Sequence, residues 1–313
     1  MRFQHYRHGF TLIELLFVIV ILGIVGGIAL EAIRQYYEGI YRTQEYNKRV
    51  ADADHILDQL SKYFENAISS SIVNLDKQGF ADACYGPPDT GDTNDYTVAF
   101  IGVDADSMQG ISGNIPGWSE ETLLGANNTI TALDVNYTMT DGIITALYPA
   151  SSLTGSAVYD TDSVDVNACT RFAFNGGATG SAGYHRITGA TGTTLALHSE
   201  NNATNGKRKY LLRTGYAFRV QDDGNFTLYS NFRPWVGERY NTAGNRQENL
   251  LGQNVEHFYA DYNATDFMAN PDVSVRGLVW RLKVCMRGLD ANLSTSDSES
   301  QAICRERRVH VRY

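Results

Sequence analysis

A single carboxylate inside a long apolar stretch is the feature of this sequence with the clearest chemical consequence. Residues 10–30 contain no charged side chain other than Glu14. A charge at the centre of a bilayer costs about 2.5–3.5 kcal/mol on the insertion scale, and less near an interface. Cleavage after Gly9 would leave a positively charged amine on Phe10, four residues before Glu14 and on the same helical face. We therefore expect proteolysis to supply a counter-ion for Glu14, from its own chain or from a neighbouring copy.

Residues 10–30 also have the length of a membrane-spanning helix, because 21 residues rise about 31 Å. Arg2 and Arg7 precede this stretch, so the N-terminus should be cytoplasmic and the rest of the chain should lie outside the cytoplasm. The alternative is a secretory signal peptide cut after Ala29. The uncharged run from residue 15 to residue 30 is longer than a usual signal-peptide core, and an acid stands near its start. We expect a single-pass anchor.

The stretch Gly9-Phe10-Thr11-Leu12-Ile13-Glu14, behind a short basic leader, resembles the processing motif of type IV prepilins and type II secretion pseudopilins. The resemblance implies cleavage after Gly9 by a prepilin peptidase, N-methylation of Phe10, and pairing of Glu14 with a subunit amine during docking into a helical filament. It implies a bacterial inner-membrane protein with a periplasmic C-terminal domain that later enters a pilus or pseudopilus. The implied partners are the lipid bilayer, other pilin or pseudopilin subunits and an inner-membrane assembly platform.

The sequence predicts an α+β fold in which a long N-terminal helix packs on an antiparallel, β-rich domain. Its expected parts are a leader (1–9), a transmembrane helix (10–30), an amphipathic helix (31–74) and a β-rich domain (75–313). Apolar residues at steps of three and four between Ala53 and Ile68 predict a helix face that packs on a sheet. Gly39 is the expected weak point of the helix, since an interior glycine costs about 1 kcal/mol relative to alanine.

Beyond residue 74, clusters of Gly, Asp, Asn, Thr and Ser separate short alternating runs, which is typical of antiparallel strands. The predicted strands are Tyr96–Ile101, Val255–Tyr262, Leu278–Met286 and Arg308–Tyr313. Two hairpins are predicted, one in 129–148 around Asp141-Gly142 and one in 216–229 around Asp223-Gly224. Residues 176–192, rich in Gly, Ala, Ser and Thr, are expected to form a flexible surface loop.

A second resemblance lies near the C-terminus. The segment Leu251–Phe258, followed by Tyr262 and a Val/Leu-rich strand, is similar to larger minor pilins of the W type and to the J-type pseudopilin of type II secretion. In that family such subunits are few, lie at or near the filament tip and prime assembly. The function expected from both resemblances is therefore that of a non-enzymatic minor pilin or pseudopilin.

The four cysteines indicate disulfides formed in an oxidising compartment, because their number is even and no C-x-x-C spacing occurs. Cys285 and Cys304 flank a polar insertion, and joining them would stabilise the fold by about 3 kcal/mol in the chain-entropy model. Cys84 and Cys169 would form the second pair. Four cysteines allow three pairings, so the connectivity is a hypothesis.

Other chemistry finds little support in the sequence. Asp89, Asp92 and Asp95 supply oxygen ligands for Ca²⁺, but they lack the spacing and the bidentate glutamate of an EF-hand, and a solvated acidic turn is the preferred interpretation. We therefore expect no cofactor. No nucleophile elbow, zinc-protease helix or P-loop is present. An enzyme tethered to the membrane by the helix is therefore an alternative that no sequence motif supports.

Binding is the remaining alternative function: a tip adhesin, or a minor pilin that captures DNA. Arg308, His310 and Arg312 alternate with apolar residues, and residues 207–209 are all basic, so a polyanion could contact them. A net charge of −9 argues against nucleic acid as a partner. A ligand site of this kind would be expected in the insertions 102–129 and 159–199.

Overall fold

The computed structural model spans residues 1–313, and the chain divides into two compact units, residues 1–49 and residues 50–313. The structure describes residues 11–76, 84, 96–112, 115–119, 123–125, 128–132, 134–148, 151–160, 168–174, 184–198, 209–242, 246–262, 279–288 and 302–312. The predicted fold class is confirmed, because a long N-terminal helix packs through its C-terminal part on an antiparallel β-rich domain. The fold is α+β and pilin-like.

Helix α1 (Leu12–Glu65) is continuous through Gly39. Its predicted apolar stripe is confirmed for the second unit, where five helix residues are buried at steps of three, one, three and four: Ala53, Ile56, Leu57, Leu60 and Phe64. This spacing places them along one face of the helix.

The predicted C-terminal end of this helix, at residue 74, is wrong. The helix ends at Glu65, and the chain continues as a 3₁₀ turn, η1 (Ser69–Ser71), and as strand β1 (Val73–Asp76). The Ser71 hydroxyl accepts a hydrogen bond from the Ile101 amide (2.9 Å) and donates one to the Ile68 carbonyl (2.7 Å). Directly after the helix, the Asn66 carbonyl accepts from the Val103 amide (2.8 Å) and the Ile68 amide donates to the Ile101 carbonyl (2.9 Å). Pairing with residues 101–103 therefore takes the place of the helical turns that apolar spacing alone would continue.

The larger sheet is antiparallel throughout and follows the order β1-β2-β10-β7-β8-β9-β6-β5, with β11 paired to β10 and β12 paired to β11. Its other strands are β2 (Tyr96–Val103), β5 (Leu123–Gly125), β6 (Thr129–Thr131), β7 (Ala157–Asp160), β8 (Tyr184–Thr191), β9 (Thr194–Leu197), β10 (Lys209–Val220), β11 (Phe226–Phe232) and β12 (Gln247–Gly252). Strand β10 is central because its first residues pair with β7 and its last residues pair with β11. The sheet therefore forks along β10.

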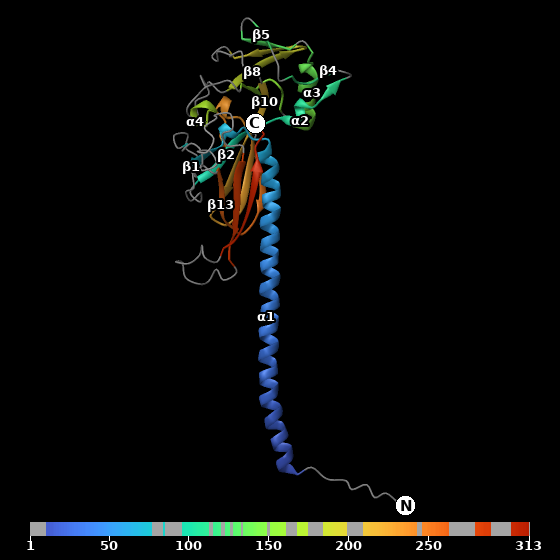
Figure 1. Ribbon diagram of the computed structural model, residues 1–313, viewed down its shortest axis with the longest axis vertical. Helices are drawn as coiled ribbons and strands as arrows, with labels where there is room; N and C mark the ends of the chain where they lie inside the picture. The colour runs from blue at the N-terminus through green and yellow to red at the C-terminus, as the bar shows by residue number, and fades with distance from the viewer. Residues whose placement is uncertain are drawn as a thin grey trace, which may run out of the picture. The chain divides into compact units, whose positions relative to one another are not determined.

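A second sheet has the order β13-β14-β15, and two very short strands pair beside the helices of the domain. These strands are β13 (Val255–Tyr262), β14 (Val279–Met286), β15 (Ile303–His310), β3 (Ile111–Ser112) and β4 (Ile115–Pro116). The remaining helices are α2 (Ala105–Met108), α3 (Tyr137–Leu147), α4 (Ala168–Arg171) and η3 (Pro234–Val236). Figure 1 shows α2, α3 and β4 gathered at one side of the domain.

The main core joins the last four turns of α1 to both sheets. The helix side chains pack with Phe100 and Phe218 of the larger sheet and with Trp280 and Leu282 of the smaller one. In Figure 1 the strands of the smaller sheet run beside this part of the helix. Helix and strand approach closely at Gly252, where an added Cβ would lie 2.4 Å from Cδ1 of Ile56. A side chain at this position would therefore force Ile56 to shift, and glycine avoids this.

Two further apolar clusters complete the domain. One, around Phe172, Trp235 and Tyr240, lies on β1, β2, β7, β10 and β11 and includes Cys169. The other joins α3 to β6, β7, β8 and β9 through residues such as Tyr137, Ile144 and Ile187. The fold thus buries apolar surface on both faces of the larger sheet.

The strand predictions have mixed outcomes. The strands at 96–101, 255–262 and 278–286 are confirmed as β2, β13 and β14, and the hairpin around Asp223-Gly224 is confirmed by the pairing of β10 with β11. The C-terminal strand begins at Ile303 and ends at His310, earlier than predicted. Part of the expected loop at 176–192 is instead strand β8, while residues 175–183 lie outside the described residues.

The hairpin predicted around Asp141-Gly142 is wrong, because these residues lie inside helix α3. Asn136 caps the helix by accepting hydrogen bonds from the amides of residues 138 and 139. Tyr137, Thr140 and Ile144 are buried at helical spacing. An Asn cap followed by buried residues at steps of three and four favours a helix, and it outweighs the turn preference of Asp-Gly.

Candidate functional site

Glu14 lies in the first turn of α1, with its side chain exposed. The amides of Glu14 and Leu15 both donate to the carbonyl of Thr11, at 3.1 and 3.2 Å, so the helix starts immediately before the acid. A carboxylate in a first turn interacts favourably with the positive end of the helix dipole. The helix therefore stabilises Glu14 only in part, and a cation near the N-terminus would complete its charge balance.

The N-terminal half of α1 presents apolar side chains on every side. No residue from 12 to 49 is buried, and the exposed apolar residues include Ile13, Phe17 and Ile24. In the part of the chain that the structure describes, α1 is the one helix long and apolar enough to cross a membrane, with a mean hydropathy of 2.8 in its most apolar window. A helix that is hydrophobic all round needs lipid or other helices as surroundings.

Residues 4–30 match the family model of the prokaryotic N-terminal methylation motif. The N-terminus is of the prepilin type. The match supports a type IV pilin-like protein, and it implies processing by a prepilin peptidase, assembly with other pilins and anchoring through the N-terminal helix. No curated protein and no solved structure matches this chain.

Gly9 and Phe10 of this prepilin-type N-terminus lie outside the described residues. Cleavage after Gly9, methylation of Phe10 and pairing of the new amine with Glu14 therefore stay predictions. Helix α1 begins at Leu12, two residues beyond Phe10.

Both proposed disulfides are present in the pilin-like domain. Cys84 bonds Cys169, and Cys285 bonds Cys304. The second bond joins residues directly opposite each other on β14 and β15. The Cys84–Cys169 bond connects Cys84, which pairs with Leu75 of β1 in a single β-bridge, to helix α4. It therefore links two segments that are 85 residues apart. Such bonds fit the oxidising compartment that the cysteine count indicated.

The predicted cationic surface meets the acids of α1 through Arg312, while Arg305 and Arg307, which also pair with this helix, were not predicted. Three ion pairs join β15 and the residues after it to the helix: Arg305–Asp54 (3.1 Å), Arg307–Asp58 and Arg312–Glu65 (3.5 Å). Hydrogen bonding and the positive charge of Arg307 hold the pKa of Asp58 below its usual value. Of the predicted set, Arg308 and His310 are exposed. They lie on the face of β15 opposite to Val309, which is buried. The arginines therefore mainly fasten the C-terminal strand to the helix.

Two other predicted clusters lie mostly outside the described residues. Residues 207 and 208 are not described, while Lys209 is fully buried and is not part of a cationic surface. Asp89, Asp92 and Asp95 are not described either. Among the described residues, no three His, Cys, Asp or Glu side chains gather in a way that could hold a metal ion.

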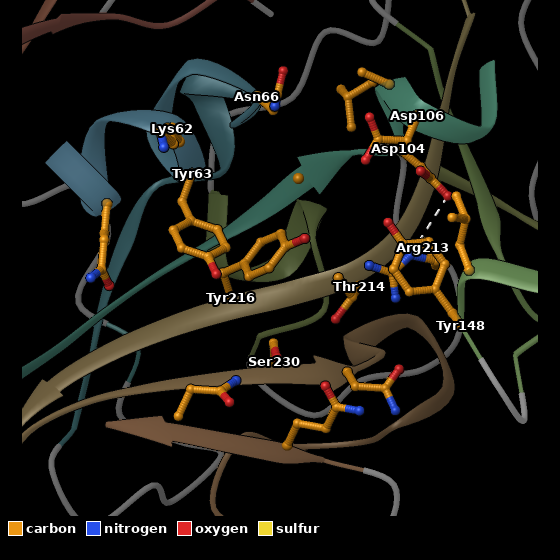
Figure 2. Close-up of a pocket in the computed structure, with 18 residues that line it drawn as sticks. Lys62, Tyr63, Asn66, Asp104, Asp106, Tyr148, Arg213, Thr214, Tyr216 and Ser230 are labelled. Carbon is orange, nitrogen blue, oxygen red and sulfur yellow. Dashed lines mark ion pairs between the residues drawn. The ribbon is translucent and has the colours of Figure 1, made fainter. Parts of the chain in front are cut away.

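A polar cavity of about 730 Å³ opens where the larger sheet forks along β10 (Figure 2). We call it the β10 cavity; its wall is formed by the ends of α1, β2 and α3, by α2, and by residues of β10, β11 and β12. The pairing register of β10 shifts against β2 between Leu212 and Thr214, and against β11 between Gly215 and Ala217. These irregularities bend the strand and open the surface above it.

An aromatic ring lies directly on the backbone at this cavity. An added Cβ on Gly102 would be 2.5 Å from Cε2 of Tyr216, so only glycine allows the ring to lie there. The Tyr63 and Tyr216 rings are neighbours, with centroids 5.3 Å apart, and Figure 2 shows them together at one side of the cavity. Burial raises the pKa of Tyr216 to about 12.

The opposite side of the β10 cavity holds an ion pair covered by a ring. Nε of Arg213 lies 3.6 Å from a carboxylate oxygen of Asp104, and the Arg213 guanidinium carbon lies 3.3 Å from the centroid of the Tyr148 ring (Figure 2). Asp104 also accepts hydrogen bonds from the amide and the hydroxyl of Ser107, at 3.2 and 2.7 Å. Burial raises the pKa of Asp104, against the opposing effects of Ser107 and Arg213.

Sequence reasoning did not find this cavity. Its lining residues come from segments around positions 60, 103, 147, 214, 230 and 248, and no spacing rule connects them. It touches the predicted insertion 102–129 only at that insertion's first residues and does not include 159–199. The one local sign was Gly102, because a glycine inside a strand often marks a place where another group packs closely against the backbone.

Proposed function

We propose that this chain is a larger minor pilin or pseudopilin. It is made as a precursor, processed after Gly9 by a prepilin peptidase, and incorporated as a structural subunit in a type IV pilus or a type II secretion pseudopilus, where it takes part in priming assembly. The observation that carries the proposal is the methylation motif at residues 4–30, with Glu14 the single charged residue of the apolar stretch 10–30.

The mechanism rests on charge compensation. In the precursor, Glu14 faces lipid with only the helix dipole to stabilise it. Cleavage exposes the Phe10 amine, and an amine on a neighbouring subunit can then meet Glu14 in an environment where the pair interacts strongly. Assembly thereby replaces an isolated acid in lipid by an ion pair between helices, which favours docking and fixes the register of neighbouring subunits.

The W-type or J-type assignment rests on the sequence resemblance of the segment Leu251–Phe258. It carries the chain from β12 of the larger sheet to β13 of the smaller one, and Asn254 takes a positive φ of 59° at the bend. Gly252 in the same segment lies against Ile56 of α1. The segment thus has a structural role that fixes its small and apolar positions.

Capture of DNA is not favoured. Arg312 of the predicted group is paired with Glu65 of α1, so Arg308 and His310 are the exposed basic residues that remain of this group. The net charge of −9 acts in the same direction.

Mass spectrometry of the protein isolated from its host membranes tests the proposal. We expect a mature chain that begins at Phe10 and carries one N-terminal methyl group. The Gly9→Val variant should keep its leader, since the added side chain hinders the peptidase. A mature chain that begins at Leu30, or a filament subunit that retains Met1, would contradict the proposal.

A further inference from the structure

The β10 cavity is a feature of the domain that processing and filament assembly leave unexplained. It is built from the residues around the fork of the sheet, all of them in the unit of residues 50–313. Its volume of about 730 Å³ lies within the range of small-molecule sites, about 300–1,000 Å³.

One side of the cavity is a fixed aromatic surface. Tyr216 is held against Gly102, and its ring packs at 5.7 Å from Phe100. Tyr63 packs at 5.8 Å from Phe218 as well as against Tyr216. Both rings are therefore positioned by the core before any ligand arrives, which removes an ordering cost from binding.

The rest of the lining is rich in side-chain amides. Five of them border the cavity: Gln59, Asn66, Asn231, Gln247 and Asn249. The Gln59 amide also pairs with His55 at 2.7 Å. An amide offers one acceptor and two donors, so a set of amides suits hydroxyl groups, which also donate and accept. A ligand with hydroxyls around an apolar ring face would use the amides and the tyrosine rings together.

The charges of the cavity balance. Lys62 and Arg213 oppose Asp104 and Asp106. Arg213 is paired with Asp104 and covered by the Tyr148 ring, so it is not an open receptor for an anion. A phosphate- or carboxylate-rich ligand gains little here. A purely apolar ligand would desolvate the amides and charged groups without replacing their hydrogen bonds.

We propose that the β10 cavity binds a neutral oligosaccharide, with sugar rings against Tyr63 and Tyr216 and sugar hydroxyls hydrogen-bonded to the surrounding amides. This activity goes beyond the structural role proposed above and does not depend on processing or filament assembly.

The test uses the full chain, purified in a zwitterionic detergent that has no sugar headgroup to compete for the cavity. The protein is applied to a printed array of neutral oligosaccharides, acidic oligosaccharides and single-stranded DNA. We expect binding to neutral oligosaccharides in preference to the other two classes. The Kd of the strongest neutral binder is then measured by titration calorimetry for each variant.

Tyr63→Ala removes a ring and should weaken binding about tenfold or more. Asn249→Ala, at an exposed position where folding is not at risk, should weaken it about fivefold by loss of hydrogen bonds. Gln253→Ala is the matched control, since it removes an exposed amide in the bend after β12, outside the cavity lining. Tyr63→Phe keeps the ring and should retain binding.

Preference for acidic oligosaccharides or DNA would overturn the ligand class. No binding to any oligosaccharide on the array, or equal affinity of Asn249→Ala and Gln253→Ala, would overturn the site. Crosslinking from position 249 to a second copy of this chain, without oligosaccharide binding, would mark the cavity as a contact between subunits and would also overturn the proposal. None of these outcomes changes the mature N-terminus, so failure here is distinct from failure of the proposed function.

Discussion

At the scale of single residues, Glu14 faces opposite demands in the membrane and in a filament. In lipid the carboxylate is unfavourable, and the helix start compensates it only in part. Next to a neighbouring subunit's amine the same carboxylate would be an attractive partner. The residue is therefore expected to matter for incorporation and not for cleavage, because the scissile bond after Gly9 lies five residues before it.

We predict that Glu14→Ala is processed normally but enters filaments poorly, by about tenfold or more if the pair contributes about 1.4 kcal/mol. Glu14→Asp, which keeps the charge on a shorter side chain, should be intermediate. The measurement compares the sheared filament fraction with the membrane fraction by immunoblot. Normal incorporation of Glu14→Ala would refute the charge-pair mechanism, while its failure to be processed would place the role of Glu14 at the peptidase.

Gly252 illustrates a residue whose lack of a side chain is itself required. A Cβ there would lie 2.4 Å from Cδ1 and 3.0 Å from Cγ1 of Ile56 on α1. We predict that Gly252→Ala lowers the free energy of unfolding by about 1–3 kcal/mol through overpacking, measured by chemical denaturation of the detergent-solubilised chain.

Two variants serve as controls for Gly252→Ala. Ile56→Val removes the clashing methyl group, so the double variant should be less destabilised than the sum of the two single variants. Gly142→Ala, in the interior of α3 where an added Cβ meets no atom within 4 Å, should stabilise by about 0.5–1 kcal/mol. Equal effects of the two Gly→Ala substitutions would contradict the close-packing argument.

At the scale of elements, the ion pairs between β15 and α1 make the stability of their contact depend on pH. Arg307 lowers the pKa of Asp58 in the folded state. A carboxyl group with a depressed folded pKa contributes stability above its unfolded pKa, and this contribution is lost as the pH falls through the folded pKa. We predict that wild type exceeds Arg307→Gln in stability at neutral pH and that the difference shrinks below about pH 4. Urea midpoints measured from pH 7 to pH 2.5 check this, and a difference independent of pH would assign the role of Arg307 to packing alone.

The two disulfides should differ in their effect because they close loops of different length. Cys84–Cys169 spans 85 residues and Cys285–Cys304 spans 19. In the chain-entropy model their removal costs about 4.5 and about 3 kcal/mol respectively. We predict that Cys84→Ser/Cys169→Ser is less stable than Cys285→Ser/Cys304→Ser, as judged by thermal unfolding of the two double variants. The reverse order would indicate that cross-strand support of β14 and β15 outweighs loop entropy.

Local patterns were sufficient for some elements and insufficient for others. The apolar steps from Ala53 to Phe64 predicted the buried face of α1, and Asp223-Gly224 predicted the hairpin at Gly224, where φ is 83°. Both signals are complete within about fifteen residues. Asp141-Gly142 carried the same turn signal, but the Asn136 cap and the buried face of α3 outweighed it.

Long-range features could not be predicted in the same way. The helix ends at Glu65 because residues 66–68 bond to the backbone of β2, more than thirty residues further on. Arg307 meets Asp58 across 249 positions of sequence. The β10 cavity depends on register shifts in β10 and on the fork of the sheet, and these follow from tertiary packing. The N-terminal motif, in contrast, was read directly from six consecutive residues.

At the scale of the whole molecule, the division at residues 49 and 50 separates the part of α1 that is buried in the domain core from the part that is not. Every buried residue of α1 lies at or beyond Ala53, and no residue from 12 to 49 is buried. The core that joins the helix to both sheets is therefore complete within residues 50–313. Residues 12–30 need lipid or neighbouring helices for their exposed apolar side chains, whereas the second unit buries its own.

We predict that residues 50–313, secreted to the periplasm by a cleavable signal, fold as a water-soluble domain with both disulfides formed. Because the core does not use residues 12–49, the melting temperature should lie within a few degrees of that of the full chain in detergent, and it should fall on reduction. Circular dichroism and free-thiol labelling of the unfolded, unreduced domain provide the measurements.

The matched control begins at residue 62, which deletes Ala53, Ile56, Leu57 and Leu60; without these core residues it should aggregate or remain unfolded. An unfolded 50–313 chain would show that the preceding helix is part of the domain's folding unit, and a folded 62–313 chain would show that the sheets close their core without α1.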